Sequence, residues 1–249
     1  MKLIVAGGTG VLGSLVVAQA QARGHDVIVL SRSRGIDLTG DAAPVAAAIA
    51  GADALIDVTS VSTLKEQACV AFFEAVTATL LRAEAAGGVP HHVALSIVGV
   101  DRAPYGYYAG KRAQERAVEA GPVPWTILRA TQFHEFATQM YANAAIGPVH
   151  VAPRMRTQPI AAREVATRLL ELAEVPARRD YVEIAGPREE SLVDMIRAWA
   201  RASGIRGWIP AISLPGPFGR AQRAGTLLPG PGVTTGTETF PEWLTRTTG

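Results

Sequence analysis

Residues 2–13, KLIVAGGTGVLG, constrain the fold of this chain more than any other stretch. An apolar strand pattern at 2–6 runs directly into a G-x-G-x-x-G motif that begins at Gly8, and a helical pattern follows at 12–23. A glycine-rich turn between a strand and a helix lets the backbone approach a pyrophosphate, and the helix directs its free N–H groups and positive dipole end at that charge. The arrangement therefore predicts a dinucleotide site, the alternative being a plain strand-to-helix turn.

Strand-like and helix-like patterns then alternate, which predicts right-handed βαβ crossovers and a parallel sheet. We expect further strands at 25–30, near 35–38, and at 53–58, 92–98 and 125–129. We expect helices at 12–23, 43–50, 63–86 and 107–120. The expected fold is α/β: a Rossmann-type doubly wound parallel sheet with a small C-terminal elaboration on the substrate side.

Beyond residue 135 the alternation loosens. The patterns there predict a helix near 132–144, strands near 149–152 and 157–160, a helix at 162–174, a strand at 180–184 and a helix at 191–202. From Gly204 onward Pro and Gly dominate, and we expect an ordered loop over the open side of the sheet that ends in a short helix near 240–246. A length of 249 residues suits one domain, with a dinucleotide-binding core at 1–135 and the elaboration at 136–249.

Charge and composition narrow the partners and the compartment. The 24 Lys and Arg residues nearly balance the 22 Asp and Glu residues, and the basic ones are scattered, so we expect no nucleic-acid partner. The first strand starts at the N-terminus without a leader, and no apolar run approaches the ~20 residues that cross a bilayer, so we expect a cytoplasmic protein with no membrane contact. The expected assembly is a monomer or a homodimer.

The cysteine and histidine content predicts no metal site. Cys69 is the only cysteine, which excludes an internal disulfide, and we expect it to pack on a helix as a small apolar residue. His91 and His92 adjoin a loop rather than a cluster of carboxylates or thiols.

Three segments together resemble a known family. The turn, which can also be read as Gly7-x-x-Gly10-x-x-Gly13, resembles the entry loop of the NmrA-like atypical short-chain dehydrogenase/reductases. YYAGK at 107–111 resembles the Tyr-x-x-x-Lys element of that superfamily, and PWTILRATQF at 124–133 resembles the strand and substrate loop that follow it. The resemblance implies a nicotinamide-binding fold whose turn holds the cofactor through Gly7, Gly8, Thr9, Gly10, Val11, Leu12 and Gly13.

The end of the second strand decides which dinucleotide is expected. NAD-selective sites place a carboxylate about 20 residues after the glycines, whereas NADP sites offer Arg to the 2′-phosphate. This chain has Ser31, Arg32, Ser33 and Arg34 there and no carboxylate, which favours NADPH (NADP) over NADH. The alternative is that both arginines are only solvated loop charges.

Two further pairs are cofactor candidates through the resemblance. Asp37 and Leu38 resemble the family's pair at the adenine edge, and Thr59 and Ser60 would lie beside the inner ribose. All four could equally be ordinary turn residues.

The candidate catalytic residues are Tyr107, Lys111 and Ser96. Tyr107 and Lys111 are four residues apart and share one helix face, where an ammonium favours the tyrosinate and lowers its pKa from about 10, giving an acid for a substrate oxygen. The resemblance implies that Lys111 also binds the nicotinamide ribose and that Ser96 orients the substrate oxygen. Alternatively, Tyr107 is a packing residue and the Ser96 hydroxyl bonds to backbone.

Residues beyond the carboxyl ends of strands face the ligand crevice of an open α/β sheet. This places the candidate substrate residues at Gln132, Phe133 and His134, with further apolar walls from Phe136, Met140 and Trp208. His134 titrates near neutrality and is an alternative proton donor, or else a hydrogen-bonded wall.

These features predict an NADPH-dependent oxidoreductase that reduces a small apolar substrate, an aromatic or conjugated carbonyl or a quinone. One alternative is a non-catalytic NADP(H) sensor that docks on a partner. Another keeps the fold for epimerisation, dehydration or polyketide tailoring. An intact Tyr-Lys pair favours the enzyme, because a sensor has no need of it.

Overall fold

A computed structural model describes residues 1–146 and 149–248. Up to residue 130 the elements are β1 (Lys2–Ala6), α1 (Val11–Ala22), β2 (Asp26–Leu30), the 3₁₀ helix η1 (Arg32–Arg34), α2 (Ala42–Ile49), β3 (Ala54–Asp57), α3 (Glu66–Gly87), β4 (His92–Ile97), α4 (Tyr107–Ala120) and β5 (Trp125–Ala130). They continue with α5 (Phe136–Asn143), β6 (Ala145–Ile146), β7 (Val149–His150), β8 (Ala152–Pro153), β9 (Arg156–Thr157), α6 (Ala162–Ala173), β10 (Asp180–Ala185), β11 (Glu190–Ser191), α7 (Leu192–Ala202), β12 (Ala211–Ile212), α8 (Gly216–Ala224), β13 (Thr234–Thr235) and α9 (Phe240–Thr248).

Seven strands form one parallel sheet in the order β13-β10-β5-β4-β3-β1-β2. β1 pairs with β2 on one side and with β3 on the other. The chain therefore adds β2 at one edge of β1 and then crosses over to add β3 at the opposite edge. A strand order that reverses in this way creates a crevice at the carboxyl ends of the strands. The expected Rossmann-type fold is confirmed, and its switch point is β1, the strand that enters the glycine-rich turn.

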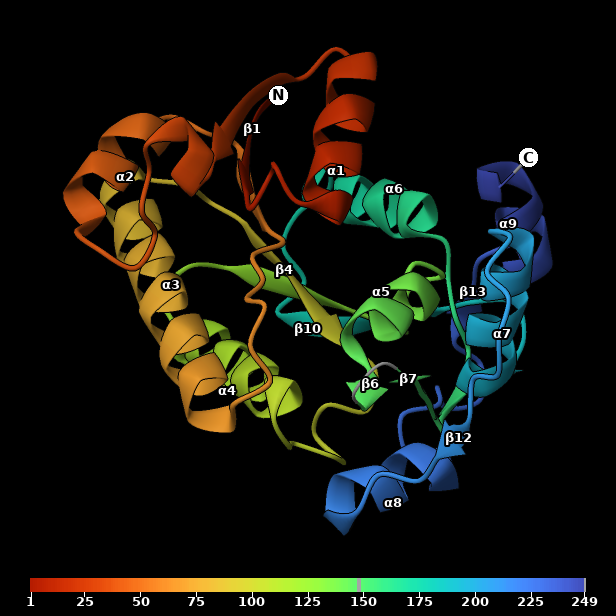
Figure 1. Cartoon of the computed structure of the whole chain (residues 1–249). Helices are drawn as coiled ribbons and strands as arrows, with labels where there is room; N and C mark the ends of the chain where they lie inside the picture. Colours follow the sequence, from red (N-terminus) through yellow and green to blue (C-terminus); the bar gives the residue numbers. More distant parts are fainter. Residues whose placement is uncertain (147–148, 249) are drawn as a thin grey trace. The chain divides into compact units, whose positions relative to one another are not determined.

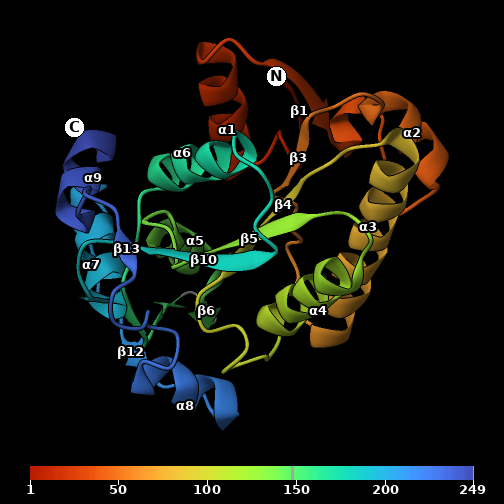
Figure 2. The ribbon, with the colours of Figure 1, turned by 180° about the vertical axis from the view of Figure 1, so that it is seen from behind.

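Residues 1–129 and 163–182 form the first of two compact units. In this unit α2, α3 and α4 lie on one face of the sheet and α1 and α6 on the other (Figures 1 and 2). Helix α3 packs against both α2 and α4. The Gln19 side chain on α1 bonds to Arg163 and Thr167 on α6, which joins the two helices of the second face.

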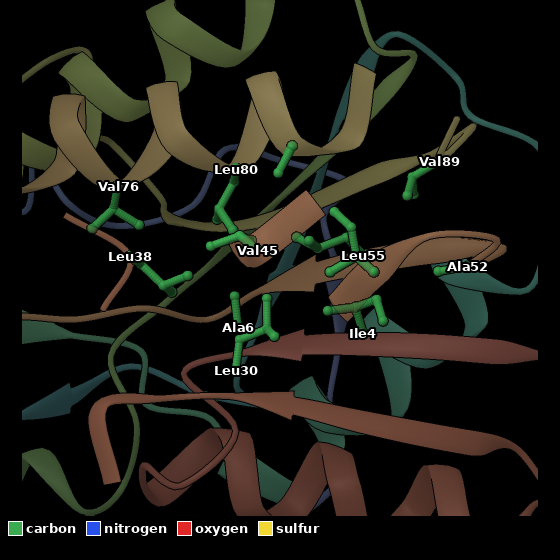
Figure 3. Close-up of a cluster of buried hydrophobic side chains, with 12 residues drawn as sticks. Ile4, Ala6, Leu30, Leu38, Val45, Ala52, Leu55, Val76, Leu80 and Val89 are labelled. Atoms are coloured by element: carbon green, nitrogen blue, oxygen red, sulfur yellow. The ribbon is translucent and has the colours of Figure 1, made fainter. Parts of the chain in front are cut away.

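Apolar side chains fill the space between the strands and α2 and α3 (Figure 3). Ile4, Leu30 and Leu55 from three neighbouring strands meet Val45 of α2 and Leu80 of α3, and all are at most 1 % exposed. Burial of one such side chain stabilises a fold by about 1.5–3 kcal/mol, so this cluster accounts for the near-continuous apolar runs of the strands.

Cys69 is buried on α3, as expected, and its thiol donates a hydrogen bond to the Thr63 carbonyl oxygen at 3.2 Å. Helix α3 ends where Gly88 takes a left-handed conformation at φ +69°. Glycine adopts this conformation without steric cost, so Gly88 stops α3 one residue after the end of the helix expected at 63–86.

The prediction of a strand near 35–38 is wrong. Gly35 is left-handed at φ +78° and ends η1, and the Asp37 carboxylate accepts a hydrogen bond from the Thr39 N–H at 2.9 Å. Both features turn the chain away from an extended path. Leu38 enters the core instead, where it is 7 % exposed.

The second compact unit, residues 130–162 and 183–249, departs further from expectation. The helix expected near 132–144 begins only at Phe136, because Phe133 pairs with Ile160 in a parallel bridge. The expected strands at 149–152 and 157–160 are the two-residue β7, β8 and β9.

The prediction of a loop from Gly204 onward is wrong, because β12, α8 and β13 interrupt it, and all of PGPFGR except the N-cap Pro215 lies in α8. Pro217 stands in the first turn of that helix, where a missing N–H costs nothing. Left-handed Gly225 ends the helix at φ +75°. The final helix expected near 240–246 is confirmed as α9.

The two compact units do not divide the chain at one point, since residues 163–182 return to the first unit. A single domain with a core at 1–135 stays a prediction, because compactness does not test whether either unit folds alone.

Candidate functional site

The turn after β1 has two positions at which only glycine fits. Gly7 is left-handed at φ +81°, and a Cβ there would lie 2.9 Å from the Val58 carbonyl oxygen. A Cβ on Gly13 would lie 2.1 Å from the Gly7 carbonyl oxygen. Both contacts are with backbone, which cannot move aside, so these glycines shape the turn and bring β1 close to α1.

Gly10 differs, because its missing side chain leaves open space. A Cβ there would meet only the Gly7 carbonyl oxygen at 3.4 Å, an ordinary contact. Gly10 is the N-cap of α1, and the first helical turn has no acidic side chain. The free N–H groups and positive end of the helix are therefore available to an anion. Of the other predicted residues of the turn, Gly8 and Leu12 are buried and Thr9 and Val11 are exposed.

The predicted 2′-phosphate residues lie on η1, directly after β2. Ser31 is buried at the N-cap, with its hydroxyl 3.0 Å from that of Ser33. Arg32 and Arg34 are exposed. Two hydroxyls and two guanidiniums within one helical turn form a strong donor set for a phosphate.

The Asp37–Leu38 pair divides into an exposed and a buried residue. The pKa of the Asp37 carboxyl is lowered, chiefly because the Thr39 N–H and hydroxyl donate to it and to a smaller extent because of the Arg32 charge. Leu38 belongs to the apolar cluster of Figure 3.

Two hydroxyls follow β3, and they differ in their partners. Thr59 is buried, and within the described part of the chain its Oγ1 has no hydrogen-bond partner. Ser60 is exposed, and its Oγ lies 2.9 Å from the Tyr107 hydroxyl. The Ser60–Tyr107 contact joins two residues that the sequence assigns to different tasks, cofactor binding and catalysis.

Ser96 of β4 is 2 % exposed. Its Oγ is also without a hydrogen-bond partner among residues 1–146 and 149–248. A buried unpartnered hydroxyl costs free energy, and Ser96 and Thr59 both stand at or near the carboxyl ends of neighbouring strands. Such groups are typical of a site that a ligand completes.

Tyr107 begins α4, and its ring packs edge-on against Phe73 at a centroid distance of 5.5 Å. Burial raises the pKa of Tyr107 to about 12, while the Ser60 hydrogen bond lowers it in part. The expectation that the pKa of Tyr107 is lowered by Lys111 is therefore wrong. The physical reason is that desolvation of the tyrosinate outweighs any attraction to the ammonium.

Lys111 is 2 % exposed, and its ammonium is held by protein acceptors. Nζ donates to the Leu95 carbonyl oxygen at 3.0 Å, to Gln114 Oε1 at 2.9 Å and to the Thr59 carbonyl oxygen at 3.4 Å. It also lies 4.4 Å from the centre of the Phe73 ring. Desolvation lowers the pKa of Lys111 to about 8, and the Asp57 charge opposes that shift.

The sequence interpretation missed the support behind Lys111. The Asp57 side chain is fully buried at the end of β3 and accepts from Gln114 Nε2 at 2.7 Å and from the Thr59 N–H at 2.9 Å. Gln114 thus links the Asp57 carboxylate to the Lys111 ammonium. Two sequence signals could have revealed this series of hydrogen bonds. One is a carboxylate that ends an apolar strand, and the other is an amide side chain one helical turn after the lysine.

A second buried ion pair anchors α4. Glu115 is 1 % exposed and accepts two hydrogen bonds, both at 2.8 Å, from the guanidinium of Arg129 on β5. Asp101 approaches the same guanidinium at 3.4 Å. Bidentate geometry is rigid, so the pair holds α4 in register with the strand that leads toward the predicted substrate residues.

The predicted substrate residues belong to the second unit, where Gln132 is buried. Its Oε1 accepts a hydrogen bond from the Thr157 hydroxyl at 2.7 Å. Phe133 is half-buried beside Ile160. The Gln132 side chain thereby ties its loop to β9.

His134 is fully buried in the same unit. Its Nε2 donates to the Glu238 carbonyl oxygen at 3.1 Å, and its ring lies 5.8 Å from the rings of Phe240 and Trp243. These contacts tie the 131–134 loop to α9. The role of His134 as a proton donor or as a hydrogen-bonded pocket wall stays a prediction.

The three remaining candidates differ in exposure. Phe136 and Met140 are half-buried on α5, whereas the Trp208 side chain is 80 % exposed. Contact of any of these residues with a substrate stays a prediction.

Within residues 1–146 and 149–248, no three His, Cys, Asp or Glu side chains group in a way that could hold a metal ion. In the same residues, no helix combines the length and the apolar character that crossing a membrane requires.

Comparisons with known proteins agree with this geometry. The profile of the NAD(P)H-binding family matches residues 7–176. No curated protein sequence matches the chain.

Several solved structures share the fold. A short-chain dehydrogenase/reductase superfamily protein from Agrobacterium tumefaciens with bound NAD is 17 % identical, with 100 % of this chain and 96 % of that chain covered and a TM-score of 0.69. An NADPH-dependent quinone oxidoreductase from Escherichia coli, complexed with NADPH, is 18 % identical over 98 % of this chain and 99 % of that chain, with a TM-score of 0.71. A nucleoside-diphosphate-sugar epimerase from Staphylococcus aureus is 16 % identical over 98 % and 99 %, also at 0.71. At such identities the likeness shows the fold alone.

Proposed function

The chain belongs to the NAD(P)H-binding family, and from that premise we propose that it is an NADPH-dependent oxidoreductase. The proposed substrate is a small apolar molecule, an aromatic or conjugated carbonyl or a quinone. We place the chain in the NmrA-like atypical group of that family, working in the cytoplasm as a monomer or homodimer on a small molecule rather than on nucleic acid.

The glycine-rich turn fits the cofactor's pyrophosphate. The space over Gly10 would be filled by any side chain, and it opens on the N-terminus of α1, which has no acidic residue in its first turn. The unpartnered Thr59 hydroxyl is a second group that a bound cofactor would complete. When bound, the nicotinamide supplies a hydride.

The proposed preference for NADPH rests on η1. Arg32 and Arg34 are exposed beside the paired hydroxyls of Ser31 and Ser33. Asp37, whose carboxylate feels the charge of Arg32, is engaged by Thr39. A 2′-phosphate would therefore meet cationic and hydroxyl donors, whereas a 2′-hydroxyl would lack a dedicated carboxylate partner.

The observation that carries the reductase proposal is the Tyr107 hydroxyl, which lies 2.9 Å from Ser60 Oγ. Because burial raises the pKa of Tyr107 to about 12, this hydroxyl keeps its proton at neutral pH and can donate to a substrate oxygen. Ser60 is exposed, so it can return a proton from solvent to Tyr107 after transfer. The unpartnered Ser96 hydroxyl supplies a second donor for orientation.

Lys111 contributes charge at the ribose end of the site. With a pKa of about 8, its amine is mostly protonated at neutral pH. The Asp57–Gln114 chain holds that cation in place. For substrate contact we retain Phe133, Phe136, Met140 and Trp208, and we assign Gln132 and His134 to holding their loop against β9 and α9.

One observation favours a second candidate, a non-catalytic NADP(H) sensor. All the donors of the Lys111 ammonium are directed at protein acceptors, so a ribose contact requires one of these bonds to be exchanged. The protonated Tyr107 hydroxyl argues against the sensor, because a protein that catalyses no reaction has no use for a proton donor.

Direct titration of NADPH and NADH by fluorescence, paired with NADPH oxidation against a panel of quinones, enones and aromatic aldehydes, tests the proposal. We expect tighter binding of NADPH than of NADH and turnover with at least one member of the panel. Tight NADPH binding without turnover would support the sensor, and absence of binding would remove both candidates.

A further inference from the structure

The second unit contains a pocket that the proposed function does not use. It encloses about 430 Å³ and is lined from β8 through β9, from the start of α7, from β12 and from α8. Helices α7 and α8 and strand β12 are visible together in Figures 1 and 2. Four arginines line this pocket: Arg154, Arg156, Arg197 and Arg223.

Two of these arginines are held in place by backbone carbonyls. Arg197 donates through Nε and Nη2 to the Ile209 carbonyl oxygen, at 3.2 and 2.9 Å. Arg223 donates through Nη1 to the Leu214 carbonyl oxygen at 2.8 Å. Neutral partners orient the guanidiniums without cancelling their charge, and each fork retains further N–H groups.

The negative charge near the pocket is smaller than the positive charge. Arg156 forms a bidentate pair with Glu189, at 2.6 and 2.9 Å. The carboxylate that lines the pocket itself is that of Asp194 on the first turn of α7. Arg154 is exposed, and no carboxylate contacts it among the ion pairs of the described residues.

We propose that this pocket binds a phosphate-bearing small molecule. Arginine recognises phosphate with parallel N–H bonds, and the four guanidiniums of the lining supply the positive charge. The volume exceeds that of a phosphate ion and lies within the range of small-ligand sites. The Asp194 carboxylate accepts hydrogen bonds from hydroxyl groups, so the favoured ligand carries hydroxyls beside its phosphate.

The site is independent of the cofactor turn, and its assignment does not rest on the proposed function. Inorganic pyrophosphate is the probe, added to the full chain saturated with NADPH, with sodium chloride at matched ionic strength as the blank. We expect a saturable rise in Tm, because a ligand that binds only the folded chain stabilises it. The same titration on Gly10→Val tests the pocket when the cofactor turn is blocked.

Arg154→Glu is the decisive variant, because this exposed side chain supports no other residue through an ion pair among those described. The pyrophosphate Kd should rise about tenfold or more, as expected for loss of a hydrogen bond between charged groups. Arg220→Glu is the matched control: it makes the same charge change on an exposed residue of α8 outside the pocket lining, and it should leave the Kd unchanged.

Arg223→Lys is a second test of the pocket, for the case that Arg154→Glu does not fold. It keeps the charge and a donor for Leu214 but loses the fork, so binding should weaken while Tm without ligand holds. A shift that does not saturate, or equal Kd values in Arg154→Glu and Arg220→Glu, would overturn the site as a general ionic effect. If the wild-type chain does not bind NADPH but still responds to pyrophosphate, the proposed function is overturned and the phosphate site remains supported.

Discussion

The Tyr107 hydroxyl oxygen lies 2.9 Å from Ser60 Oγ, although 47 residues separate the two in sequence. The contact joins the first turn of α4 to the loop after β3. One hydroxyl belongs to a ring packed on Phe73, and the other is exposed, so the pair connects a desolvated phenol with solvent.

Tyr107→Phe should lower turnover by about 10²–10⁴-fold, the usual contribution of a general acid, and leave NADPH affinity unchanged because only the hydroxyl is lost. Steady-state kinetics and a binding titration measure the two effects separately. Since the pKa of Tyr107 is raised to about 12, wild-type turnover should show no loss from tyrosine ionisation until pH approaches that value.

Ser60→Ala is the companion to this change. It should lower turnover less than Tyr107→Phe does, because the phenol remains and only its exposed partner is removed. Full activity in Tyr107→Phe would discard Tyr107 as the acid.

Lys111→Met should weaken NADPH binding and turnover together, and it should change how stability depends on pH. Folding lowers the pKa of Lys111 from 10.5 to about 8, so between these values the unfolded chain binds more protons than the folded one. The free energy of unfolding therefore gains a rising contribution across that window, on the order of 3 kcal/mol, which Lys111→Met lacks. Urea unfolding of both proteins at pH values below 8 and near 10.5 measures the difference, and parallel curves would contradict the buried amine.

Ser96→Ala should stabilise the cofactor-free protein by about 1 kcal/mol while lowering turnover. The buried Oγ has no hydrogen-bond partner in the described chain, so its removal ends a desolvation cost. Chemical denaturation and kinetics on the same preparation give both quantities. A loss of stability would show instead that the hydroxyl is structural.

Gly10→Val should abolish NADPH binding with little effect on the unfolding midpoint, because a Cβ there meets only the Gly7 carbonyl oxygen at 3.4 Å but would fill the space proposed for the pyrophosphate. Fluorescence titration and thermal unfolding report the two outcomes. Gly13→Val is the contrasting variant, since its Cβ would meet the Gly7 carbonyl oxygen at 2.1 Å and should destabilise the fold itself.

Arg32→Ala should weaken NADPH binding by roughly 1.5–3 kcal/mol, the range for hydrogen bonds to a charged partner, and leave NADH nearly unaffected. Arg116→Ala, an exposed arginine of α4, is the matched control and should change neither cofactor's Kd. An equal loss for both cofactors would exclude a 2′-phosphate contact.

Local sequence patterns are sufficient to predict most of the helices and strands of the first unit. The glycine motif and the apolar strands are short-range features that sequence reasoning recognises, and the helix expected at 107–120 coincides with α4. Around 35–38 the same reasoning failed, because an isolated short apolar run does not reveal whether it pairs with a strand or enters a core. In α8 the composition misled, since Pro and Gly are compatible with a helix when they stand at its two ends.

The sequence by itself determined the fold class and the glycine-rich turn after β1, and it identified the polar candidates, because each depends on spacing along a few consecutive residues. Only the tertiary structure decided the state of those candidates. It half-buried Tyr107 and desolvated its hydroxyl, which raised the pKa of that group, and it placed Asp57 and Gln114 behind Lys111. It also enclosed His134 between Phe240 and Trp243. Desolvation and hydrogen-bond partners depend on segments far apart in the chain, and no local pattern encodes them.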